Sequence, residues 1–152
     1  MSFLYRFFKK ATSLAFFVCG GLSAQVPLNY YLPAGVQYDA KIPTPQQFLG
    51  YQVGEWHVTN DQEVAYLRRL AELSDRIEIE EYGRTHENRP LVLLTISSPD
   101  NIQNRESLKT QHRQLTDPTR SASLDTKAMP AVLWMGYTVH GNEPSGNNAA
   151  LL

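Results

Sequence analysis

The apolar run "AVLWMGYTV", residues 131–139, constrains the fold most, because it stops abruptly at the polar stretch "HGNEPSG". A run that is apolar on both faces is typical of a strand in the centre of a sheet. Pro144 then suits the first turn of a helix that continues through "SGNNAALL". The order of strand, turn and helix predicts an α/β fold.

His140 and Glu143 lie in the turn between this predicted strand and helix. In open α/β sheets, ligands bind just outside the carboxyl ends of the strands. Imidazole nitrogen and carboxylate oxygen both bind zinc at about 2.0–2.2 Å, and Gly141 would let the backbone turn sharply between them. An H-x-x-E spacing also arises by chance in ordinary sequences. The spacing and placement therefore leave two interpretations open, a metal site and a solvated turn.

The segment before the apolar run predicts two helices and a pair of strands. Helices are expected over residues 61–75 and 101–115, strands over 76–83 and 91–97, and a loop over 116–130. Asn60 is the expected N-cap of the first helix, with Glu63 as its capping-box partner. The expected apolar stripe of that helix consists of Val64, Leu67, Leu70 and Ala71.

Residues 25–58 are rich in proline and aromatic residues, and their four prolines exclude a long helix. We expect an extended lead-in that wraps around the domain formed by residues 59–152. Six aromatic residues are expected to hold it in place: Tyr30, Tyr31, Tyr38, Phe48, Tyr51 and Trp56.

The first 24 residues resemble a secretory signal peptide. Arg6, Lys9 and Lys10 precede the apolar run "ATSLAFFVCGGL", which ends in the small residues Ser23 and Ala24. We expect cleavage after Ala24, no stable membrane anchor afterwards, and export to the periplasm or the exterior. The net charge of −1 gives no indication of nucleic-acid binding. The single cysteine excludes an internal disulfide framework.

Two stretches resemble the M14 zinc metallocarboxypeptidases. "HGNEPSG" is similar to the H-x-x-E zinc-ligand motif of that family, and "YGRTHENRPLVLLTIS" is similar to its G-x-S-x-E-G-R-P segment between two strands. In the second stretch Thr85 replaces the family serine and Asn88 replaces a glycine. The matching residues are Gly83, Arg84, Glu87, Arg89 and Pro90. The two motifs occur in the family order, and the resemblance covers about residues 45–152.

The resemblance implies a mixed-sheet α/β/α sandwich and an exopeptidase that removes C-terminal residues from peptides or proteins. It makes His140 and Glu143 ligands of one Zn²⁺ ion. It also implies that the third ligand, the arginines for the substrate carboxylate and the general base lie downstream. We expect ordinary surface positions for His57, His86 and His112. The chain then holds no catalytic residue of its own and represents the N-terminal part of a longer protein. Alone, it is expected to be inactive and poorly folded.

Several alternatives stay open. A related zinc amidase or deacylase could share the scaffold, and a secreted binding module could retain a site without activity. Asn142 stands where some family members carry a substrate-binding arginine, which indicates a divergent branch. An internal ion pair is expected to hold the loop with Arg84, Glu87 and Arg89. Core or rim positions are expected for four aromatic residues: Tyr66, Tyr82, Trp134 and Tyr137.

Overall fold

The computed structural model describes residues 26–152. The predicted signal peptide, residues 1–24, lies outside the described residues. The helices are α2 (Pro45–Leu49), α3 (Asn60–Leu73), α4 (Pro99–Gln103), α5 (Arg105–Leu115) and α6 (Pro144–Ala150). Strands β1 (Ile77–Arg84) and β2 (Pro90–Ile96) and two 3₁₀ turns, Leu28–Tyr30 and Ser121–Ser123, complete the elements of this part of the chain.

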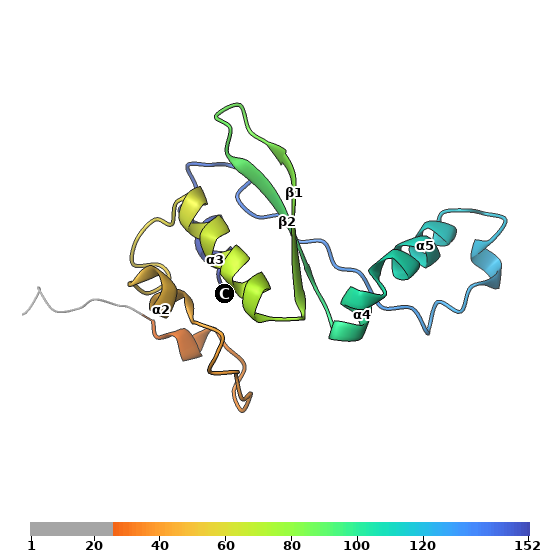
Figure 1. Ribbon diagram of the computed structural model, residues 1–152, viewed down its shortest axis with the longest axis horizontal. Coiled ribbons are helices and arrows are strands. Elements are labelled where there is room, and N and C mark those ends of the chain that lie inside the picture. Colours follow the sequence, from red (N-terminus) through yellow and green to blue (C-terminus); the bar gives the residue numbers. More distant parts are fainter. Residues whose placement is uncertain (1–25) are drawn as a thin grey trace, which may run out of the picture.

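The two strands form an antiparallel hairpin, as their sequence predicts. Ile77 pairs with Ile96 at the open end, and Arg84 pairs with Pro90 next to the loop. The register shifts between Glu81 and Gly83, which makes the intervening Tyr82 a bulge residue. Helix α3 packs against the hairpin (Figure 1). Helices and this small sheet together make an α/β arrangement, which confirms the predicted class.

Helix α3 starts one residue earlier than predicted, at Asn60. Thr59 is the N-cap, and its backbone N–H donates to the Gln62 side chain at 3.1 Å. The predicted cap of Asn60 with Glu63 is therefore wrong by one position, and Glu63 is buried instead. Val64 and Leu67 are buried, whereas Leu70 and Ala71 are half-buried, so the predicted stripe is largely confirmed.

The core joins segments that are far apart in the sequence. Val53 and Val58 from the lead-in, Tyr66 from α3 and Leu151 after α6 form one buried cluster. The Tyr66 hydroxyl donates to the Pro43 carbonyl at 2.9 Å, and burial raises its pKa to about 12. This confirms the core position predicted for Tyr66. The division predicted between residues 58 and 59 stays a prediction.

The lead-in is held by valines more than by its aromatic residues. Its helical content is short, as its prolines predict: α2 begins at Pro45 after the Thr44 cap and ends at Gly50, whose φ is 85°. The Phe48 ring lies at a tilted angle against Tyr66 with ring centroids 5.4 Å apart, and Tyr51 packs against the core. The other four predicted anchors are exposed, so that part of the prediction is wrong: Tyr30, Tyr31, Tyr38 and Trp56.

The predicted helix over residues 101–115 is divided in two. Asn104 leaves the helical region at φ −97° and ψ 15°, and its side chain donates back to the Asp100 carbonyl at 2.9 Å. Asparagine competes for backbone hydrogen bonds in this way and so favours helix ends. Helix α5 extends away from the body formed by α2, α3 and the hairpin (Figure 1). An ion pair between Arg105 and Glu78 links its start to β1.

The apolar run 131–139 is not a strand in this structure, which corrects the central prediction of the sequence. All nine residues are exposed, Leu133 by 87%. A buried strand needs hydrogen-bonding partners on its edges and apolar layers on its faces. In residues 26–152, the strands β1 and β2 pair only with each other. Trp134 and Tyr137, expected in the core or at its rim, are exposed here, and so is Tyr82.

Candidate metal centre

His140 and Glu143 meet in the turn that precedes α6. The Nδ1 atom of His140 lies 3.0 Å from the Oε1 atom of Glu143. The backbone N–H of Glu143 donates to the His140 carbonyl at 3.0 Å, which closes a tight turn around the two side chains. The side chains are 66% and 63% exposed, so their polar atoms are open to a ligand. The structure thus brings the predicted pair together on the surface.

The backbone around this turn differs from expectation in one respect. The residue with positive φ is Thr138, at 56°, two positions before His140. Gly141 lies in the middle of the hydrogen-bonded turn from His140 to Glu143, as predicted, but it does not need a positive φ to do so. Glu143 is the N-cap of α6 and Pro144 occupies its first turn, as predicted. The start of α6 therefore fixes where the Glu143 backbone lies.

The pair fits two of the donors of a zinc site. Two ligands of one tetrahedral zinc ion, each at about 2.0–2.2 Å, lie about 3.3–3.5 Å apart. The observed separation of 3.0 Å is a hydrogen-bond contact between the two side chains, and it is shorter than this ligand-to-ligand distance. Catalytic zinc ions use three protein ligands. In residues 26–152, however, no group of three or more His, Cys, Asp or Glu side chains could hold a metal ion.

The other three histidines lie away from the turn in the sequence and in different environments. His57 and His86 are exposed. The Nε2 atom of His112 lies 3.1 Å from the Pro130 carbonyl, so that this half-buried ring links α5 to the following loop. His57 and His86 match the surface positions predicted for them, and His112 has a structural contact.

The hairpin loop is held by its own side chains. Arg84 pairs with Glu81 at 2.7 Å and donates to the Asn88 carbonyl at 2.9 Å, and Arg89 pairs with Glu87 at 3.0 Å. This confirms the predicted internal ion pair. Asn88 has a φ of 61°. Asparagine and glycine are the residues that most readily adopt this conformation, which explains how Asn88 can stand where the M14 pattern has glycine.

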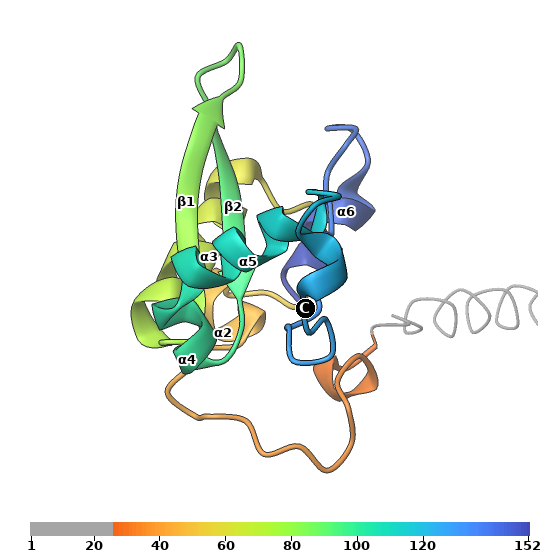
Figure 2. The same ribbon diagram turned by 90° about the vertical axis from the view of Figure 1, so that its right-hand side faces the viewer.

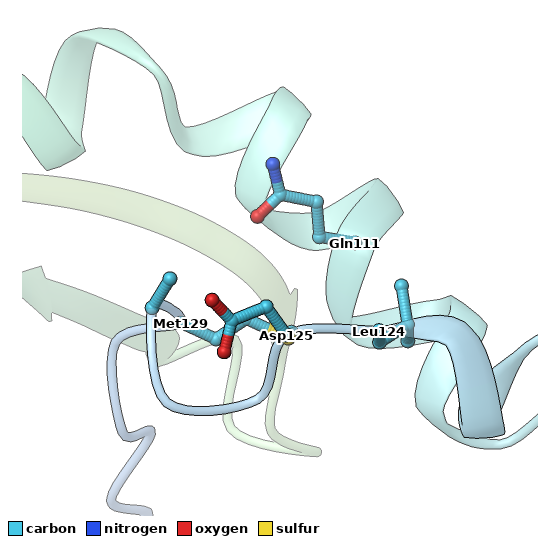
Figure 3. Close-up of a pocket in the computed structure, with 5 residues that line it drawn as sticks. Gln111, Leu124, Asp125 and Met129 are labelled. Atoms are coloured by element: carbon cyan, nitrogen blue, oxygen red, sulfur yellow. The ribbon is translucent and has the colours of Figure 1, made fainter.

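A shallow hollow between α5 and the loop that follows it does not resemble a metal site. Figure 3 shows Gln111 on the helix and Leu124, Asp125 and Met129 on the loop. Asp125 is the only acidic residue of the lining, and its Oδ1 accepts the Lys127 backbone N–H at 3.2 Å. The hollow includes neither His140 nor Glu143.

Two residues that were not predicted from the sequence hold α6 to the lead-in, Asn147 and Asn148. The Asn147 side chain donates to the Val58 carbonyl at 3.0 Å, and the Asn148 side chain accepts the Gly54 N–H at 3.0 Å. Asparagine is a weak helix former. Two adjacent asparagines inside a short helix were therefore the available signal of a tertiary role.

One comparison identifies the class of protein. Residues 63–152, more than half of the chain, match the family model of the zinc carboxypeptidases, Peptidase M14. The chain therefore belongs to the zinc carboxypeptidase family, and its described residues form an incomplete α/β fold of that type. Comparison with curated proteins and with solved structures gave no match. No helix among residues 26–152 is long and apolar enough to cross a membrane.

Proposed function

We propose that the complete protein is a zinc-dependent metallocarboxypeptidase that hydrolyses C-terminal residues from peptides. The observation that carries this proposal is the His140–Glu143 pair, at 3.0 Å in an exposed turn, inside the region that matches the zinc carboxypeptidases. Family membership supports a peptidase and zinc, and the turn supplies two donors of the right chemistry.

In this proposal His140 and Glu143 hold a single Zn²⁺ ion. Bound zinc polarises a scissile carbonyl and lowers the pKa of its water ligand. The chain's own contribution is to place an imidazole nitrogen and a carboxylate oxygen side by side in a turn whose end is fixed by α6. The third ligand, the general base and the arginine for the substrate carboxylate are proposed to lie outside residues 1–152.

We further propose that the protein is exported. The support is the sequence of residues 1–24, in which three basic residues precede an apolar run and a small-residue cleavage site. The substrates would then be peptides of the periplasm or the exterior. N-terminal sequencing of the protein from its native host tests this directly: the proposal expects a mature chain that starts at Gln25, and an intact Met1 would refute cleavage.

The test of activity uses the complete protein and two matched peptides that differ only in a free or an amidated C-terminus. We expect release of the last residue from the free peptide, loss of that activity on chelation and its return with zinc. The amidated peptide should resist, because a carboxypeptidase requires the terminal carboxylate. Equal cleavage of both peptides would favour the amidase alternative, and activity that survives chelation would exclude the zinc mechanism.

A further inference from the structure

We propose that Asn147 and Asn148 are positioning residues of the metal centre: they tie α6 to the lead-in segment Val53–Val58, and through α6 they fix the His140–Glu143 turn. This inference rests on the proposed function, because it assigns a role in zinc binding. The lead-in segment would then support the site although it lies before the region matched by the zinc carboxypeptidases, which starts at residue 63.

The first link is the hydrogen bond from Asn147 to the lead-in. Its Nδ2 donates to the Val58 carbonyl at 3.0 Å, between residues 89 positions apart. Val58 is fully buried. A carbonyl in such surroundings is costly to leave unpaired. The bond therefore constrains where the middle of α6 can lie against the core.

The second link joins the lead-in to the very start of α6. Asn148 Oδ1 accepts the N–H of Gly54 at 3.0 Å, while its Nδ2 donates to the Pro144 carbonyl at 2.9 Å. Gly54 adopts a φ of 86°, in the left-handed region that favours glycine. Pro144 directly follows Glu143, so one amide side chain connects the lead-in to the residue beside the proposed ligand.

The third link holds the other side of the turn. A Cβ atom on Gly146 would lie 2.9 Å from the backbone nitrogen of Thr138. The chain entering the turn therefore lies directly on α6, and only glycine allows this approach. Figure 2 shows α6 together with the chain that turns back before it. A shift of α6 is thus transmitted to Thr138 on one side of His140 and to Glu143 on the other.

The test measures zinc affinity in the complete protein, by competition with a chelator of known affinity, for the parent and for Asn147→Asp. The ionised aspartate is isosteric but cannot donate to the Val58 carbonyl. Asn101→Asp is the matched control. Asn101 lies on α4, is also part-buried, and donates to the Ser97 hydroxyl at 2.9 Å. The thermal midpoint of each metal-free variant is recorded alongside.

We expect Asn147→Asp to weaken zinc binding about three- to tenfold, the effect of losing one buried hydrogen bond. Asn101→Asp should keep the parental zinc affinity even where its thermal midpoint falls. At saturating zinc, kcat of Asn147→Asp should fall, whereas its KM should stay at the parental value. Equal zinc affinity in all three proteins would overturn the inference and leave the proposed function intact. A parent that binds no zinc would refute the proposed function itself.

A second pair of variants keeps the test decisive if Asn147→Asp does not fold. Asn148→Asp retains an acceptor for the Gly54 N–H, whereas Asn148→Leu does not. We expect Asn148→Asp to bind zinc more tightly than Asn148→Leu. Identical zinc affinities of these two variants would contradict the role of the lead-in bond.

Discussion

The two sides of the His140–Glu143 turn are held very differently. After the turn, α6 is hydrogen-bonded to the lead-in and Leu151 is buried with Val53 and Val58. Before the turn, residues 131–139 are apolar but exposed. The turn is therefore held mainly by α6, on which the chain before His140 packs at Thr138. The candidate ligands are placed by the contacts of α6 and Leu151 with the lead-in. The segment that was predicted to be a strand contributes less.

The largest expected difference concerns two leucines on opposite sides of the turn. Leu151 is 5% exposed and Leu133 is 87% exposed. Leu151→Ala should lower the free energy of unfolding by about 2–5 kcal/mol, because it leaves a cavity in the core. Leu133→Ala should change it by less than about 0.5 kcal/mol. Urea denaturation of the 152-residue chain measures both. The core described here predicts a cooperative transition, in contrast to the poorly folded chain expected from the sequence, and equal losses would show that residues 131–139 are buried after all.

Two glycines give the next contrast. Gly146→Ala should destabilise the protein by about 1–2 kcal/mol, because overpacking against Thr138 exceeds the roughly 1 kcal/mol that alanine gains in a helix. An added Cβ at Gly141 meets nothing within 4 Å, so Gly141→Ala should be close to neutral. Thermal denaturation compares the two. A neutral Gly146→Ala would mean that α6 and Thr138 are not in contact.

Hydrogen exchange compares the two apolar segments directly. In the 152-residue chain, the paired amides of β1 and β2 should exchange at least about tenfold more slowly than those of residues 131–139, because paired backbone must open first. Mass spectrometry of peptic fragments resolves the two segments. Equal protection would indicate that residues 131–139 pair as a strand, as the sequence predicts.

The smallest expected effect is a pH dependence of the free energy of unfolding, which arises from the buried Glu63 on α3. Burial raises the pKa of Glu63 above its ordinary 4.5. Folding then favours the protonated carboxyl, so Glu63 makes the protein less stable as pH rises from 4.5 through the raised pKa. Glu63→Gln should therefore stabilise the protein at pH 7, by about 0.5 kcal/mol or less after solvent screening. The gain should vanish below pH 4.5.

Glu106 on α5 provides a control of opposite sign. A hydrogen bond from Lys109 lowers the pKa of this exposed carboxyl. Its contribution to stability is present above the ordinary pKa and is lost as pH falls through the lowered one. Denaturation curves of Glu63→Gln and Glu106→Gln across pH 3–7 would separate the two effects. Parallel pH dependence of both variants would contradict the burial of Glu63.

Local signals were enough to predict most elements. Alternation around Ile77 and Ile79 predicted β1, and Pro144 predicted the start of α6. The hairpin follows because its strands are close in sequence. Strand formation by residues 131–139 depends on partners that local sequence cannot specify. The contacts of Asn147 and Asn148 span 89 and 94 positions, beyond the reach of any spacing rule.

The candidate pair itself could be predicted, because its two residues lie three positions apart and a resemblance covers both. The backbone contacts that hold this pair in place could not be predicted from the sequence. The sequence correctly placed a sharp turn at Gly141, but it did not predict the positive φ at Thr138 or the close approach at Gly146. Both depend on how α6 docks, which is a tertiary property.

The most direct test is the zinc affinity of the complete protein with His140→Ala and Glu143→Ala, using His86→Ala as a control because His86 is exposed and lies in the hairpin loop. The proposed site predicts one zinc ion per chain in the parent and in His86→Ala. It predicts an affinity at least about 100-fold weaker in His140→Ala and in Glu143→Ala. Parental affinity in both of these variants would show that the His140–Glu143 turn is a solvated turn and no metal centre.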